Sequence, residues 1–74
     1  MLGQSPNAAS RLSTLRKRRL LSQRALAERA QIALSTLYLL EAGKTKPTFK
    51  VMSAICKALA VEPTEVEEFL AALE

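Results

Sequence analysis

The chain has 74 residues, of which 49% are apolar, and its eleven Lys and Arg against seven Glu give a net charge of +4. A chain of this length forms one domain at most. Histidine is missing and Cys56 is the single cysteine, which excludes an intrachain disulfide, a Cys/His zinc site and histidine-based acid–base catalysis. No metal, cofactor or small-molecule site is expected. The chain is not expected to be an enzyme, because no nucleophile with a base and no phosphate-binding glycine loop can be assembled.

No unbroken apolar run is longer than the five residues from Phe69 to Leu73, and the run from Leu37 to Leu40 has four. A membrane-spanning helix needs about 20 such residues. The segment from Met1 to Ala9 lacks the basic start and the apolar centre of a secretion signal. We therefore expect a soluble, cytoplasmic protein with no membrane partner.

Basic and acidic residues are separated along the chain. Residues 1–60 hold all eleven Lys and Arg against two Glu, a net charge of +9, whereas residues 61–74 hold five Glu, a net charge of −5. A polyanion would be attracted to the first part and repelled by the second. The charge pattern therefore favours a nucleic acid that meets the protein in one orientation.

The first elements are an irregular tail and a helix. Residues 1–9 show no periodicity and are expected to form a flexible tail, followed by one domain at 10–74. Ser10 is a possible N-cap for a first helix that ends near Arg18 or Arg19.

The next elements are two helices joined by a tight turn. Ser22 is a good N-cap for a helix from Gln23 to about Ala30. A third helix, roughly Leu34 to Ala42, is followed by Gly43, which supplies the left-handed residue that ends a helix.

Two further helices complete the predicted all-α, five-helix fold. Thr48 can cap a fourth helix that runs to Leu59. The Thr64-Glu65-Val66-Glu67 segment has the spacing of a capping box and predicts a fifth helix over 64–73. Four large apolar residues share one side of it: Val66, Phe69, Leu70 and Leu73.

The second and third helices have the spacing of a helix-turn-helix at 23–42, in which the second helix of the pair enters the major groove of DNA. Ala27 is the small residue that lets the two helices cross closely. Apolar residues on both sides close over the crossing: Leu26, Ala30, Ile32, Leu37 and Leu40.

The sequence resembles the lambda-repressor-like or Cro-type helix-turn-helix family from about Leu12 to Val66. The most specific match is the E-x-G-K-x-x-P pattern from Glu41 to Pro47, at the family's distance after S-Q-x-x-L-A. The other matching segments are Leu15-Arg16, Ser22-Gln23 with Leu26-Ala27-Glu28, Ser35-Thr36-Leu37, Lys46-Pro47-Thr48 and Ala58-Leu59-Ala60-Val61.

The resemblance implies double-stranded DNA as the partner and assigns roles to individual residues. It places Gln23 on a phosphate or an edge base, and Lys44 and Lys46 over the DNA backbone. It matches Arg16 and Glu41 to a structural ion pair between the first and third helices. The positions that it turns toward the groove are Ala33, Leu34, Ser35, Thr36 and Leu39.

The chain departs from the family pattern at several positions. Leu20 and Gln31 stand where glycine is usual, so a left-handed backbone at either residue would carry strain. The groove-facing positions are mostly apolar, and such side chains can touch thymine methyl groups but cannot hydrogen-bond to bases. Hydrogen-bonding readout would then depend on the remaining polar residues: Gln23, Ser35, Thr36 and Tyr38.

Several residues have a structural interpretation beside the functional one. Phosphate contact by at least one of Lys17, Arg18 and Arg19 competes with a solvated surface. Tyr38 can contact DNA through its hydroxyl or pack against protein. Cys56 falls on the inward face of the fourth helix and is expected to be a buried, inert side chain.

We expect a dimeric transcription regulator, a repressor or controller protein, that reads a palindromic operator. Four large apolar residues on one short terminal helix exceed what the domain can bury, so Val66, Phe69, Leu70 and Leu73 are expected at a homodimer interface. The alternative is a protein-interaction or antitoxin module that uses the apolar face of the third helix. That alternative leaves the separated positive charge unexplained.

Overall fold

The structure is a computed structural model that describes residues 9–74, so all of the predicted tail except Ala9 lies outside the described residues. Four α-helices are followed by three short 3-10 turns. The helices are α1 (Leu12–Arg18), α2 (Gln23–Ala30), α3 (Leu34–Glu41) and α4 (Phe49–Leu59), and the turns are η1 (Pro63–Glu65), η2 (Glu67–Phe69) and η3 (Ala71–Leu73). The all-α fold class is confirmed for these residues.

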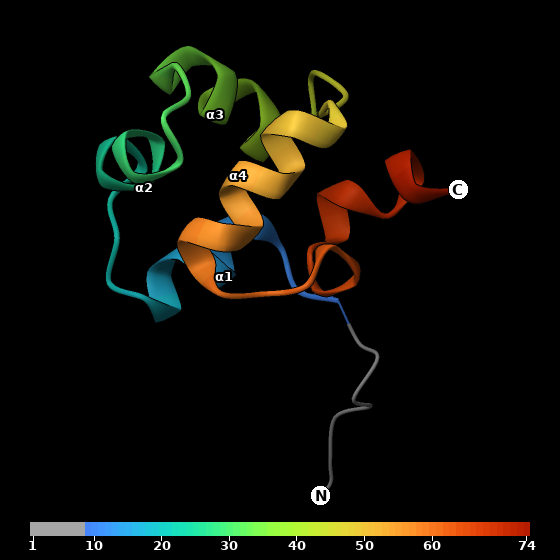
Figure 1. Ribbon diagram of the computed structural model, residues 1–74, viewed down its shortest axis with the longest axis horizontal. Coiled ribbons are helices and arrows are strands. Elements are labelled where there is room, and N and C mark those ends of the chain that lie inside the picture. Colours follow the sequence, from blue (N-terminus) through green and yellow to red (C-terminus); the bar gives the residue numbers. More distant parts are fainter. Residues whose placement is uncertain (1–8) are drawn as a thin grey trace, which may run out of the picture.

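The helices enclose one hydrophobic core. In Figure 1, α4 crosses the middle of the molecule, α3 lies above it, α1 lies below it and the terminal turns cover the right side. Eight large side chains from all of these segments are fully buried: Leu12, Leu26, Leu37, Leu40, Ile55, Leu59, Val66 and Phe69. Leu21, in the connection between α1 and α2, also belongs to this core.

Two predicted helix caps are present. The Ser22 hydroxyl accepts a hydrogen bond from the Ala25 N–H at 3.0 Å, and the Thr48 hydroxyl accepts one from the Val51 N–H at 3.2 Å. Each cap satisfies a backbone donor that the first turn of a helix leaves without a partner.

The predicted Ser10 cap is wrong. Ser10 forms an isolated parallel bridge with Val66: the Ser10 N–H donates to the Glu65 carbonyl, and the Glu67 N–H donates to the Ser10 carbonyl, both at 2.9 Å. This pairing keeps Ser10 in the segment before α1, and the N-cap position is occupied by Arg11. The first N–H of α1, on Leu12, donates instead to Glu68 Oε1 at 2.8 Å.

The predicted fifth helix over 64–73 is also wrong in detail. Val66 has an extended backbone, with φ −107° and ψ 114°, because it pairs with Ser10. A continuous α-helix cannot pass through an extended residue. The terminal segment therefore breaks into 3-10 turns. Its capping box is formed by Glu62 and Glu65 instead of Thr64 and Glu67, and the Glu62 N–H donates to Glu65 Oε2 at 2.6 Å.

Among the described residues, Leu20, Gln31 and Ala60 have the left-handed backbone that favours glycine, with φ of 58°, 58° and 56°. The first two are the positions at which strain was predicted. Gln31 ends α2 and lets the chain turn sharply toward α3, while Leu20 allows the corresponding turn between α1 and α2.

Replacing Leu20 with glycine is expected to stabilise the fold by about 0.5 to 1 kcal/mol. Glycine removes the steric cost of the left-handed backbone, roughly 1 to 2 kcal/mol, but loses more conformational entropy on folding. The leucine side chain is 93% exposed, so little packing is lost with it. The urea midpoint measures the effect. Arg24→Gly, at an exposed helical position, should instead lower the midpoint, and a Leu20→Gly midpoint below that of the parent would contradict the strain argument.

Candidate nucleic-acid interface

The helix-turn-helix is built by α2, the turn at Gln31 and α3. The Ile32 N–H donates to the Ala27 carbonyl at 3.0 Å, which closes the end of α2 around the left-handed Gln31. Ala27 itself is buried between the helices. A larger side chain there would push α2 and α3 apart. Helix α3 therefore packs against α2, and no other described segment covers the outer side of α3.

The outer side of α3 carries most of the predicted groove-facing residues. Ala33 and Ser35 are exposed, and Tyr38 and Leu39 are 53% and 44% exposed. Leu34 and Thr36 are half-buried, and Leu34 packs against the core. The accessible face of α3 thus combines a few hydroxyl groups with apolar surface.

The ion pair implied by the family resemblance is formed. Arg16 Nε donates to Glu41 Oε2 at 2.8 Å, and Arg16 Nη2 donates to Glu41 Oε1 at 3.2 Å. The two side chains are 10% and 8% exposed. Arg16 also donates through Nη1 to the Leu21 carbonyl at 2.9 Å. The pair therefore joins α1, the loop before α2 and the end of α3.

Gln23 belongs to the same network, which the sequence patterns did not indicate. Its Nε2 donates to Glu41 Oε1 at 3.0 Å, so the side chain expected on DNA is held against the ion pair. Glu41 is the single carboxylate of α3, and Arg16 neutralises it. The end of α3 is consequently less repulsive to a phosphate than its sequence suggests.

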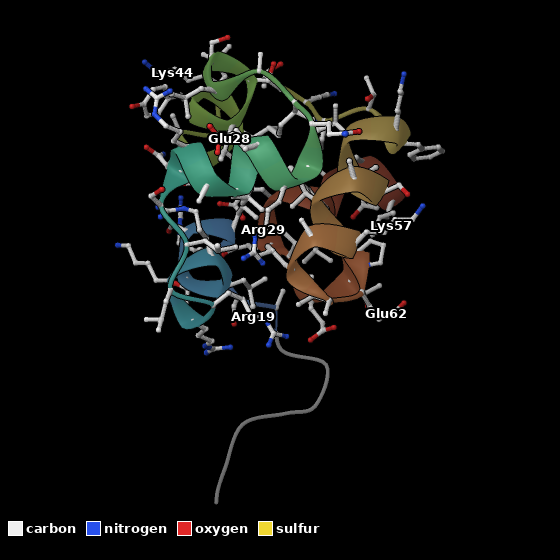
Figure 2. The ribbon with its side chains drawn as sticks, turned by 60° about the vertical axis from the view of Figure 1, so that its left-hand side comes forward. Arg19, Glu28, Arg29, Lys44, Lys57 and Glu62 are labelled. Carbon is white, nitrogen blue, oxygen red and sulfur yellow. The ribbon has the colours of Figure 1, made fainter. Side chains whose placement is uncertain are left out.

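The loop after α3 presents the two predicted backbone-contacting lysines. Gly43 has φ 71° and the Lys44 N–H donates to the Leu39 carbonyl at 2.9 Å, which fixes the start of the loop at the end of α3. Lys44 and Lys46 are both exposed. Figure 2 shows Lys44 at the top of the molecule and Arg19 at the opposite end.

The basic cluster of α1 has a mixed role. Arg19 Nε donates to the Leu59 carbonyl at 3.0 Å and so caps the last turn of α4. This contact favours the structural interpretation for Arg19. Lys17 and Arg18 are exposed on α1, which lies below the core while α3 lies above it (Figure 1).

The structure divides the four predicted interface residues into two pairs. Val66 and Phe69 are fully buried in the core of the single chain, whereas Leu70 and Leu73 are exposed. The first pair is buried because the terminal turns fold back over α1 and α4. In the structure, Val66 and Phe69 therefore stabilise the monomer.

An apolar groove of about 620 Å³ lies between α4 and the terminal turns. Met52, Cys56, Val61 and Leu73 line it, and Phe49 at its edge is 72% exposed. Its charged lining residues have opposite signs on opposite sides, with Lys57 from α4 and Glu62 and Glu65 from the terminal segment.

Cys56 is buried, as predicted. Burial is the main factor that raises the pKa of its thiol above the usual value, and the nearby charges of Glu62 and Glu65 raise it further. A thiol with a raised pKa is mostly protonated near neutral pH and is a poor nucleophile. Across residues 9–74, the helices are too short and too polar for any of them to span a membrane.

The comparisons with known proteins agree with this arrangement. A family model described as helix-turn-helix matches residues 12–66. The match begins with α1, includes α2, α3 and α4, and ends at Val66 in the terminal segment. No curated protein and no solved structure matches the chain.

Proposed function

The chain belongs to the helix-turn-helix family of the lambda-repressor and Cro type, a family of DNA-binding regulators, and we propose that it binds a specific duplex DNA sequence with α3 in the major groove. The observation that carries this proposal is the exposed outer side of α3, followed directly by the exposed Lys44 and Lys46. Their ammonium groups can bind phosphates at the edge of the groove that α3 enters.

We propose that base recognition combines few hydrogen bonds with apolar contacts. The hydroxyls of Ser35, Thr36 and Tyr38 can donate to or accept from base edges. Ala33, at the N-cap of α3, and Leu39, within α3, are exposed and can contact thymine methyl groups. An operator rich in thymine along the contacted groove fits this surface best.

Binding is expected to depend steeply on salt. A dimer that neutralises about 6 to 10 phosphates should lose roughly 10³ to 10⁵ in affinity between 50 and 200 mM salt. The Lys44→Ala, Lys46→Ala double variant should weaken binding to all duplexes alike, because phosphate contacts carry no base information. Fluorescence anisotropy with labelled duplexes measures both effects, with Lys17→Ala, Arg18→Ala as the control for net charge. A flat salt titration of the parent would disprove the DNA-binding proposal.

We propose that a second copy of the chain supplies the second recognition helix. One recognition helix reads a few base pairs, and a two-fold partner reads a second half-site about 34 to 36 Å away. The apolar groove beside α4 is a candidate surface for this partner, because one copy's exposed Phe49 can enter the other copy's groove. Such a surface is self-complementary, as a two-fold interface requires. The operator would then be palindromic, and the simplest mode of action is repression.

Leu73→Asp is expected to produce a monomer, because it places a charge in the lining of the groove. Ala71→Asp is the matched control, since Ala71 is exposed in the same turn. Sedimentation velocity measures the oligomeric state. The Leu73 variant should lose far more affinity for a full operator than for a half-site. A parent that is monomeric at high micromolar concentration, or equal behaviour of the two variants, would show that the interface lies elsewhere.

A protein-interaction module is the second candidate function. The exposed Tyr38 and Leu39 on α3 favour it, because apolar side chains on an outer helix face can also bind a partner helix. The Lys44 and Lys46 substitutions separate the two functions, since they should hardly change an apolar helix-helix contact.

A further inference from the structure

A second groove lies between the end of α2 and α4, away from the apolar one. It has a volume of about 480 Å³, and three cationic side chains line it: Arg29, Lys50 and Lys57. Gln31 and Ser53 add polar groups. Figure 2 looks onto this side of the molecule, with Arg29 extending from α2 and Lys57 from α4.

Within the part of the chain that the structure describes, none of the three cations forms an ion pair. The ion pairs within residues 9–74 involve Arg11 and Arg16, and no Glu lines the groove. In Figure 2, Glu28 lies above Arg29 and Glu62 lies below Lys57, outside the lining residues. Three like charges around one hollow repel one another, and this repulsion falls when an anion binds between them.

The basic groove continues to the start of the recognition helix. A neighbouring hollow of about 410 Å³ is lined by Ala33 and Thr36 of the α3 region together with Gln31 and Lys50. Gln31 and Lys50 thus line both hollows. Lys50 therefore lies near the N-terminal end of α3, whereas Lys44 and Lys46 follow its C-terminal end.

We propose that Arg29, Lys50 and Lys57 form a second phosphate-binding site, which holds the DNA backbone on the side of the major groove opposite Lys44 and Lys46. The major groove is about 12 Å wide and is bordered by one backbone on each side. A helix that lies in the groove with cations near both ends can contact both backbones. Lys50 binds the nearest phosphate, and Arg29 and Lys57 bind phosphates farther along the flanking DNA.

This inference rests on the proposed DNA-binding function and extends it to the second strand. The test variant is Arg29→Gln, Lys50→Gln, Lys57→Gln, which keeps polar side chains of similar length. The control is Lys17→Gln, Arg18→Gln, with two exposed cations of α1 neutralised. Circular dichroism melting checks that both variants fold like the parent.

Two measurements on the parent and the variants test the second phosphate-binding site. In salt titrations, each lost phosphate contact should reduce the slope of log affinity against log salt by about 0.9. The groove variant should therefore lose a slope of roughly 2 to 3 per protomer, and the control much less. In ethylation interference, the parent should depend on phosphates of both strands within each half-site, and the groove variant should lose the dependence on one strand of each half-site.

The possible failures are distinguishable. If Lys44→Ala, Lys46→Ala abolishes binding while the groove variant keeps the parent's salt slope and interference pattern, the second site is disproved and the proposed function stands. If the groove variant and the control lose the same slope for each charge removed, general charge explains the effect and the site is likewise disproved. A parent that binds no duplex would overturn both proposals.

Discussion

Replacement of Glu41 with glutamine is expected to lower the free energy of unfolding by about 3 to 5 kcal/mol. Glu41 accepts hydrogen bonds from two nitrogens of Arg16 and from Gln23, and its side chain is almost fully buried. The neutral amide leaves the Arg16 charge without compensation in a site from which water is largely excluded. A domain of this length has roughly 4 to 11 kcal/mol of total stability, so a loss of this size removes a large fraction of it and should lower the urea midpoint strongly.

Urea denaturation followed by circular dichroism measures this loss. Glu28→Gln is the matched control, because Glu28 is exposed on α2 and its substitution should change stability by no more than about 0.5 kcal/mol. Replacing both partners with apolar residues, as in Arg16→Met, Glu41→Leu, should recover much of the stability, because no buried charge then remains unpaired. Equal urea midpoints for Glu41→Gln and the parent would mean that the network contributes little to folding.

The Phe69→Ala variant is expected to lose about 3 to 5 kcal/mol of stability through the cavity that it leaves in the core. Phe69 is fully buried, although it belongs to a terminal 3-10 turn of three residues. Its loss should loosen the terminal segment and, with it, the Glu68 carboxylate that caps α1. The thermal midpoint and the urea midpoint should both fall well below those of the parent.

The neighbouring Leu70→Ala is the control for Phe69→Ala, since Leu70 is exposed in the same segment. It should change the monomer's stability only slightly. If Phe69→Ala instead folds as stably as Leu70→Ala and changes the oligomeric state, Phe69 would belong to an interface, as the sequence pattern first suggested.

Local patterns in the sequence determined the central part of the protein. The Ser22 and Thr48 caps and the spacing of apolar residues predicted α2, α3 and α4 to within one residue, because these features act within one or two helical turns. The resemblance to the family supplied the pair of Arg16 and Glu41, which are 25 residues apart. The left-handed backbone at Leu20 and Gln31 followed from the positions where glycine is usual.

Tertiary contacts decided both ends of the domain. Ser10 pairs with Val66, and Glu68 caps a helix that starts 56 residues earlier, so neither contact leaves a pattern within one segment. The same pairing extends Val66 and breaks the predicted fifth helix. An amphipathic segment shows that it buries one face, but its sequence does not say whether that face meets its own chain or a second copy. The terminal turns fold over α1 and α4. This fold buries the apolar side chains of Val66 and Phe69 within their own chain, away from water.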